Sequence, residues 1–226
     1  SNSFSPGSYD SVFYNCHYRF YANEMIRMHS DNPFNNSYRS FFVNCSVASD
    51  IVKNAFVACD YSCFYNCDAK LEATIYDTDG NGTSLTGYSN YKAQYYSCRC
   101  TLNVNINVVM PVDRYYSTTA NSRAFGYGFI SQGENTVYHN CNASISCVSY
   151  ISYMANDTYG PYQACYADSI AYGFQYSPKS GDVISGCNAT LSVSATAEYS
   201  RYVEGKATEE KCELYNMDNG ECEGES

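Results

Sequence analysis

One stretch, residues 186–195, constrains the fold of this chain more than any other. Its odd positions carry Cys187, Ala189, Leu191, Val193 and Ala195, and its even positions carry Asn, Thr and Ser. This alternation is typical of a β-strand with one buried face and one solvent-exposed face. The cysteine lies on the predicted buried face, and position 188 opens an N-glycosylation sequon on the exposed face.

The same design recurs in residues 67–75, 98–108 and 141–147, and more loosely in residues 16–21. Two further segments repeat each other, because Tyr127-Gly128-Phe129 and Tyr172-Gly173-Phe174 each precede a Val and then a cysteine-led strand. We interpret each copy as a β-hairpin, with polar loops at residues 131–135 and 177–182. No solenoid period holds across the whole chain. The sequence therefore predicts an all-β fold of one or two antiparallel β-sandwiches, immunoglobulin-like or jelly-roll-like.

We expect four segments in this order. Residues 1–10 form a flexible or extended arm, residues 11–112 a first β-sandwich half or domain, and residues 113–203 a second one with the repeated hairpins. Residues 204–226 form an acidic tail, with a loop closed by Cys212 and Cys222 as one option. The tail is either a solvated terminus or a segment that meets a neighbouring molecule.

Cysteine and tyrosine dominate the composition. The chain of 226 residues has 13 Cys and 26 Tyr, whereas Leu, Ile, Val and Phe together stay under about 20%. Cross-links and buried tyrosine rings would compensate for this thin aliphatic core. All thirteen cysteines are disulfide candidates, and the odd number leaves at least one unpaired or paired outside the chain: Cys16, Cys45, Cys59, Cys63, Cys67, Cys98, Cys100, Cys141, Cys147, Cys165, Cys187, Cys212 and Cys222.

Abundant cysteine is typical of oxidising compartments, so we expect an extracellular protein, secreted or at the cell surface. The start without Met fits a chain from which a signal peptide has been cleaved. Six sequons support the secretory route; they begin at Asn35, Asn44, Asn81, Asn142, Asn156 and Asn188.

Two patterns resemble metal sites. Cys59, Cys63 and Cys67 are four residues apart, which on a helix would align three sulfurs, but no fourth ligand has a customary zinc spacing and separate disulfides fit better. Asp77, Asp79 and Asn81 imitate the start of an EF-hand loop, but Tyr88 stands where a bidentate Glu is required. We therefore expect a hairpin turn there, no bound calcium, and no other cofactor besides covalent N-glycans.

The sequence predicts no enzyme. His17 adjoins Cys16, but neighbours on a strand face opposite ways, so the two cannot form a nucleophile–base pair. His29 and His139 stand near turn residues, and no hydrolase, protease or phosphate-binding motif is present. The net charge of −10 disfavours nucleic acid and anionic membranes as partners, and no apolar run reaches the about 20 residues that span a bilayer.

These features favour a structural glycoprotein that is a subunit of a filament, fibril or surface coat, assembled from copies of itself through strand or arm exchange and tyrosine-rich contacts. The long apolar segment 11–28 is the candidate donor or acceptor strand. In composition, sequons and strand style the chain resembles secreted fibril and coat subunits of eukaryotic microbes. The alternative is a lectin-like carbohydrate-binding module, with platforms drawn from Tyr88, Tyr91, Tyr95, Tyr96, Tyr159 and Tyr162.

Overall fold

The computed structural model describes residues 7–22, 28, 32–78, 81–110, 120–153, 164–174, 179–199, 204–213 and 219–224, and these form three sheets with no helix. The first sheet contains β1 (Val12–Tyr14), β4 (Phe41–Val43), β7 (Cys63–Tyr65), β10 (Gln94–Tyr96), β13 (Val137–His139) and β16 (Val183–Ser185). The second contains β2 (His17–Phe20), β5 (Ser46–Ser49), β8 (Asp68–Asp77), β11 (Arg99–Met110), β14 (Asn142–Tyr153), β17 (Asn188–Tyr199) and β19 (Asn219–Gly224). The third contains β3 (Phe34–Asn35), β6 (Asn54–Val57), β9 (Asn81–Asn90), β12 (Ala120–Ser131), β15 (Ala164–Tyr172) and β18 (Glu204–Glu213).

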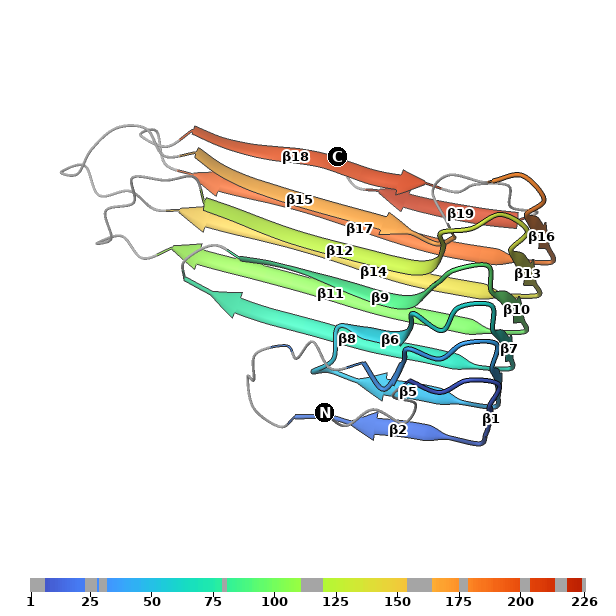
Figure 1. The fold of residues 1–226 in the computed structure, drawn as a ribbon. Coiled ribbons are helices and arrows are strands. Elements are labelled where there is room, and N and C mark those ends of the chain that lie inside the picture. The colour runs from blue at the N-terminus through green and yellow to red at the C-terminus, as the bar shows by residue number, and fades with distance from the viewer. Residues whose placement is uncertain are drawn as a thin grey trace.

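The chain is a parallel β-solenoid. It passes from the first sheet to the second and then to the third, and each such coil stacks on the previous one, from β1–β3 upward (Figure 1). The prediction of an all-β fold is confirmed, but the antiparallel sandwich, immunoglobulin-like or jelly-roll-like, is wrong because neighbouring strands run parallel in all three sheets. Alternation of apolar and polar residues indicates a half-buried strand in either orientation, so it could not separate the two arrangements.

The predicted hairpins are also wrong. Strand β12 is followed by β13 in a different sheet, and β8 is followed by β9 in a different sheet. The repeated Tyr-Gly-Phe units are nevertheless equivalent, because Tyr127 pairs in register with Tyr172 one coil later. The sequence shows no constant repeat length because the coils differ in length. Equivalent residues in successive coils are separated by between 22 and 46 positions.

A left-handed backbone residue turns the chain from the first sheet into the second. In six successive coils the residue that precedes a cysteine has a positive φ between 51° and 61°. Asparagine and glycine tolerate this conformation better than other residues, and they occupy five of the six positions: Asn15, Asn44, Asn66, Asn140 and Gly186, with Ser97 as the sixth. The amide Nδ2 of Asn66 donates a hydrogen bond of 2.7 Å to Oδ1 of Asn44, which ties neighbouring turns together.

The core contains two stacked columns of aromatic rings. The first aromatic ladder is Phe13, Phe42, Phe64, Tyr95 and Tyr138, with ring centroids 4.8–5.3 Å apart. The second aromatic ladder is Phe34, Phe56, Tyr88, Phe129 and Phe174, with centroids 4.6–5.1 Å apart. Rings of the two ladders meet edge to face, as Phe56 and Phe64 do at 5.7 Å and 77°. Such pairs add about 0.5–1.5 kcal/mol each beyond their buried area.

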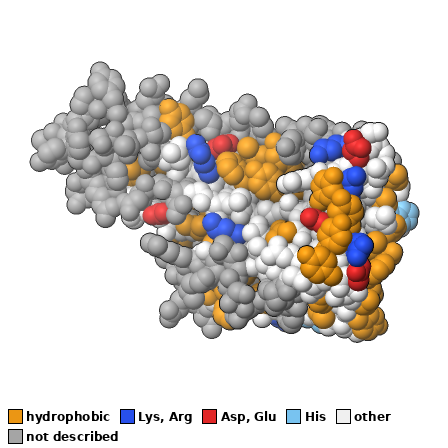
Figure 2. All heavy atoms as spheres, in the orientation of Figure 1, with side chains coloured by type: hydrophobic (Ala, Val, Ile, Leu, Met, Phe, Trp, Pro, Cys, Tyr) orange, Lys and Arg blue, Asp and Glu red, His pale blue; other side chains and the backbone are white. Residues whose placement is uncertain are grey.

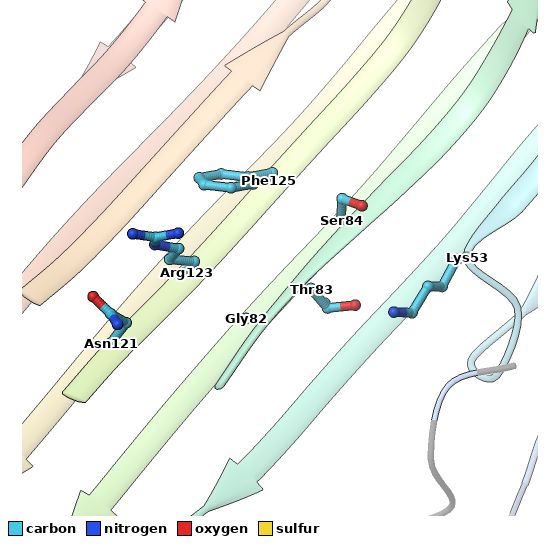
Figure 3. Close-up of a pocket in the computed structure, with 7 residues that line it drawn as sticks. All are labelled: Lys53, Gly82, Thr83, Ser84, Asn121, Arg123 and Phe125. Carbon is cyan, nitrogen blue, oxygen red and sulfur yellow. The ribbon is translucent and has the colours of Figure 1, made fainter. Parts of the chain in front are cut away.

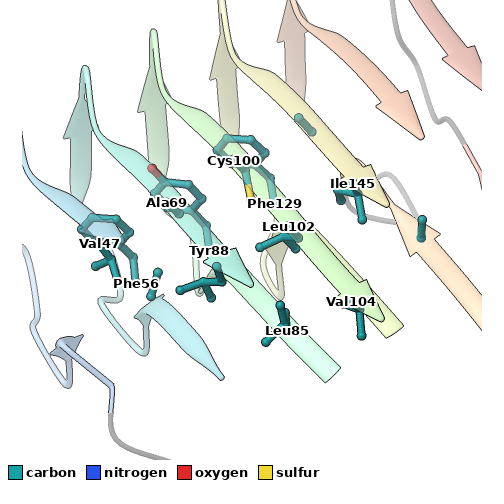
Figure 4. Packing of buried hydrophobic residues seen from close by; sticks show 14 of the residues in the cluster. Val47, Phe56, Ala69, Leu85, Tyr88, Cys100, Leu102, Val104, Phe129 and Ile145 are labelled. Carbon is teal, nitrogen blue, oxygen red and sulfur yellow. The ribbon is translucent and has the colours of Figure 1, made fainter. Parts of the chain in front are cut away.

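Aliphatic side chains fill the space between the second and third sheets (Figure 4). Leu71 of β8, Leu102 of β11 and Leu85 of β9 are completely buried there. Small inward residues such as Ala69 and Ala73 alternate with exposed or half-buried polar residues along the same strand. The predicted inward face of the cysteine-led strands is therefore confirmed for β8, β11, β14 and β17.

The predicted domain boundary near residue 113 lies outside the described residues. The strands on either side, β11 and β12, belong to sheets that continue from one predicted half into the other. The predicted N-terminal arm is described from Gly7, and the amide of Asp10 donates to the carbonyl of Tyr38 at 3.0 Å. The described part of the predicted acidic tail continues the solenoid as β18 and β19. Among the described residues, no helix has the length and apolarity to cross a membrane.

Candidate binding surfaces

Six cysteines stack inside the turn between the first and second sheets, and we call them the thiol ladder: Cys16, Cys45, Cys67, Cys98, Cys141 and Cys187. The register of the flanking strands places them at equivalent positions in successive coils. Each of the middle four thiols donates to the carbonyl of an aromatic residue in the coil below, as Cys67 Sγ does to Phe42 at 3.4 Å. These carbonyls belong to the central residues of β1, β4, β7 and β10, so each thiol connects the turn to the strand of the coil below.

Ladder thiols also interact with one another. Hydrogen bonds from the thiols of Cys45 and Cys98 lower the pKa of Cys67, and those from Cys187 and Cys98 lower the pKa of Cys141. In Cys98, burial is the main cause of a pKa raised well above the usual value. The direction of the pKa shift therefore alternates along the ladder: it is downward at Cys67 and Cys141 and upward at Cys45, Cys98 and Cys187.

All ten cysteines with described side chains are free thiols in this structure, and the predicted Cys165, Cys212 and Cys222 lie outside the described side chains. Disulfide formation stays a prediction, and the fold restricts its pattern. Neighbouring parallel strands are about 4.7–4.9 Å apart, within the about 4.4–6.8 Å that separates the Cα atoms of a disulfide. Rungs next to each other in the thiol ladder are thus the pairs that this geometry could join.

The predicted sequons occupy different environments. Asn142 and Asn188 are exposed and face each other in register at the starts of β14 and β17, although the two sequons are far apart in the sequence. Asn35 and Asn44 are half-buried. The side chain of Asn81 and the whole of Asn156 lie outside the described part of the structure.

The residues considered for metal binding do not converge. Cys63 lies in β7, Cys59 follows β6 and Cys67 precedes β8, so the three occupy different sheets or turns. Asp77 ends β8, whereas Asp79 lies outside the described residues. No group of three or more His, Cys, Asp or Glu with metal-binding geometry occurs among the residues that the structure describes.

The described histidines form pairs with serines of the next coil. Nδ1 of His17 is 2.8 Å from Oγ of Ser46, and Nδ1 of His139 is 2.8 Å from Oγ of Ser185. Both contacts join exposed side chains, but they lie in different sheets, since His17 belongs to β2 and His139 to β13. They are therefore two separate outer contacts between neighbouring coils. His29 lies outside the described residues.

Tyrosines of the predicted lectin surface are divided between core and exterior. Tyr88 and Tyr95 are fully buried in the aromatic ladders, so they cannot stack on a sugar. Tyr91 and Tyr96 are only partly buried, and Tyr159 and Tyr162 lie outside the described residues. Tyr88 was predicted to be a platform residue, but Gly87 and Tyr88 are both buried, so the burial in this part of β9 does not follow a simple alternation.

Tyr91 belongs to an outer column that the sequence did not reveal, and we call Tyr9, Tyr38, Tyr61 and Tyr91 the tyrosine column. Its ring centroids are 5.0–5.9 Å apart, with planes inclined by 48–66°. Arg39 and Lys92 lie over rings of the column at 5.4 and 5.5 Å, and the space-filling view shows apolar side chains interleaved with charged ones on one face (Figure 2). Because neighbouring rings are inclined, the column offers no flat platform for a chain of sugars.

A hollow of about 390 Å³ opens on the outer side of the third sheet, and we call it the polar hollow. Three successive coils contribute its side chains (Figure 3). They come from the segment before β6, from β9 and from β12: Lys53; Gly82, Thr83 and Ser84; Asn121, Arg123 and Phe125. This lining contains two cations, hydroxyl and amide groups and one aromatic ring, and no carboxylate.

Gly82 allows the close approach of two strands at the floor of the hollow. A Cβ atom at this position would lie 2.7 Å from Cβ of Arg123, its register partner on β12. Real Cβ atoms do not approach so closely, so any larger residue would displace Arg123.

No protein family matches this chain. The comparison with family models, the search of curated proteins and the search of solved structures all found nothing similar. Inferences about function therefore rest on the residues and geometry described above.

Proposed function

We propose that the protein is an extracellular structural glycoprotein whose copies assemble end to end into a filament, fibril or coat. The observation that carries this proposal is the open edge of the first coil. Strands β1 and β2 end their sheets, so each has one side without a described neighbour. Unpaired strand edges are templates for pairing with another chain.

Inward side chains of the first coil support this proposal, because they are more exposed than their equivalents in the second coil. Phe13, Cys16 and Tyr18 are only partly buried. Their equivalents Phe42, Cys45 and Val47 are at most 1% exposed. Exposed Val12, Tyr14 and Phe20 add apolar surface beside the same strands. A further coil stacked on this end would bury the partly covered residues as each later coil does.

A second copy is the occupant that fits best, since its own parallel strands have the required spacing and twist. Pairing would add main-chain hydrogen bonds along β1 and β2 and would cover the partly buried Phe13 and Cys16 of the first coil. This contact joins different surfaces of the two copies, and such head-to-tail contacts build open filaments when they do not close into a ring. In this proposal whole coils of two copies stack end to end, whereas the sequence analysis expected exchange of a strand or an arm.

Electron microscopy and sedimentation velocity test the proposal. We expect linear assemblies whose length increases with protein concentration. Tyr18→Lys, which places a charge on the open end of the core, is expected to yield monomers. Tyr76→Lys is the matched control, because Tyr76 is 59% exposed on β8, a strand with neighbours on both sides.

A wild-type protein that stays monomeric at all concentrations would contradict the proposal. Assembly of the Tyr18→Lys variant at the wild-type level, with unchanged circular dichroism, would show that another surface mediates association. The glycoprotein part is tested separately, by the mass lost on enzymatic deglycosylation of material from the native source. The exposed Asn142 and Asn188 are the positions where we expect the sugar.

A further inference from the structure

We propose that the polar hollow is a binding site for a saccharide that carries a carboxylate group. The hollow is independent of the open edge, so this inference goes beyond the proposed assembly. Its size falls within the about 300–1,000 Å³ of small-molecule sites. The hollow lies on the outer face of the third sheet, and its lining comes from three successive coils.

Charge is the first argument. Arg123 and Lys53 lie on opposite sides of the hollow (Figure 3), and neither belongs to the three ion pairs between described residues. Asp168 is the register neighbour of Arg123 on β15, on the side away from β9, so the strand order separates it from Lys53. In a chain with a net charge of −10, two cations around a lining without carboxylates form a local site for an anion.

The remaining lining favours a sugar over a bare inorganic anion. The side chains of Ser84 and Asn121 supply hydroxyl and amide groups, which hydrogen-bond sugar hydroxyls. The ring of Phe125 is half-buried at the rim and supplies an apolar wall for the C–H face of a pyranose. Arginine binds carboxylates with two parallel hydrogen bonds, which fixes the orientation of the acidic group.

Isothermal titration calorimetry with the full chain tests the inference. The probes are a galacturonic acid oligomer and a sialylated lactose as two sources of the carboxylate, with a neutral galactose oligomer, lactose and inorganic phosphate as comparisons. We expect at least one acidic probe to bind at least tenfold more tightly than its neutral counterpart, and its affinity to fall as salt increases. Phosphate is expected to compete only weakly.

Arg123→Gln is expected to weaken binding of the acidic probe at least tenfold, and Phe125→Ala is expected to weaken it severalfold. Lys92→Gln is the matched control, because it removes one positive charge from the tyrosine column and should leave the affinity within twofold of wild type. The inference is overturned if acidic and neutral probes bind equally, if phosphate competes as well as the sugar, or if Arg123→Gln binds as wild type. Circular dichroism of each variant establishes that it is folded.

Discussion

Two fully buried tyrosines on neighbouring rungs of the first aromatic ladder give a sharp test of the core. Tyr95 and Tyr138 stack at 5.3 Å with planes only 6° apart, but their hydroxyls differ. The hydroxyl of Tyr95 accepts a hydrogen bond of 3.0 Å from Nδ2 of Asn90, which is itself 2% exposed. The hydroxyl of Tyr138 is buried with no partner among the described residues.

The same chemical change should therefore have opposite effects at these two positions. Tyr138→Phe removes an unsatisfied buried hydroxyl, which costs about 1–3 kcal/mol, so we expect a gain of about 1 kcal/mol in the free energy of unfolding. Tyr95→Phe leaves the amide of Asn90 unsatisfied, so we expect a loss of about 1–3 kcal/mol.

Urea titration followed by far-ultraviolet circular dichroism measures both effects. With a slope of about 2 kcal/mol per molar urea, the midpoint of Tyr138→Phe should rise by about 0.5 M and that of Tyr95→Phe should fall by at least that much. A loss of stability in both variants would refute the reasoning, because it would mean that the hydroxyl of Tyr138 is hydrogen-bonded in solution.

Three further predictions concern the core. Phe64→Ala should destabilise the protein by about 3–5 kcal/mol in the same urea titration. Tyr65 lies on the outer face of the same strand and is 37% exposed, so Tyr65→Ala should cost under about 1.5 kcal/mol. Equal losses in the two variants would contradict the assigned faces. Burial raises the pKa of Tyr88, Tyr95 and Tyr138 well above 10, so these tyrosines lose their protons at a lower pH in the unfolded state than in the folded state. The stability that is present below about pH 10 should therefore fall as the pH rises above it. Urea midpoints that stay unchanged up to about pH 11.5 would contradict this prediction. In peptide maps of oxidised protein, disulfides of the thiol ladder should join neighbouring rungs only, and a bond between distant rungs would contradict the register.

The strands themselves were predictable from the sequence, whereas their arrangement was not. Alternation in residues 67–75 and 98–108 identified β8 and β11 and their inward faces. Parallel pairing depends on contacts between residues more than 20 positions apart, which local alternation does not report. One available signal was overlooked: an aromatic residue stands three positions before the cysteine in five coils, and Asn or Gly stands directly before it in all but one.

The candidate surfaces were even less predictable from the sequence than the arrangement of the strands, because they depend on the register between coils. Lys53, Ser84 and Arg123 meet because three coils of unequal length bring them side by side, so no spacing in the sequence indicates the polar hollow. In the tyrosine column, likewise, Tyr38 and Tyr61 come together only through stacking. The abundance of tyrosine was recognised correctly as both core and surface material, but assigning each ring required the coil boundaries.

The unequal spacing of rungs has a consequence for how such chains can change over generations. Successive corners superpose although the intervening segment can double in length, from 22 to 46 residues. Insertion or deletion of the segment between two such corners would add or remove a complete coil while keeping the register of the coils on either side. The number of coils and the length of the connecting loops can thus change independently, and solenoids with different numbers of coils could share one cross-section.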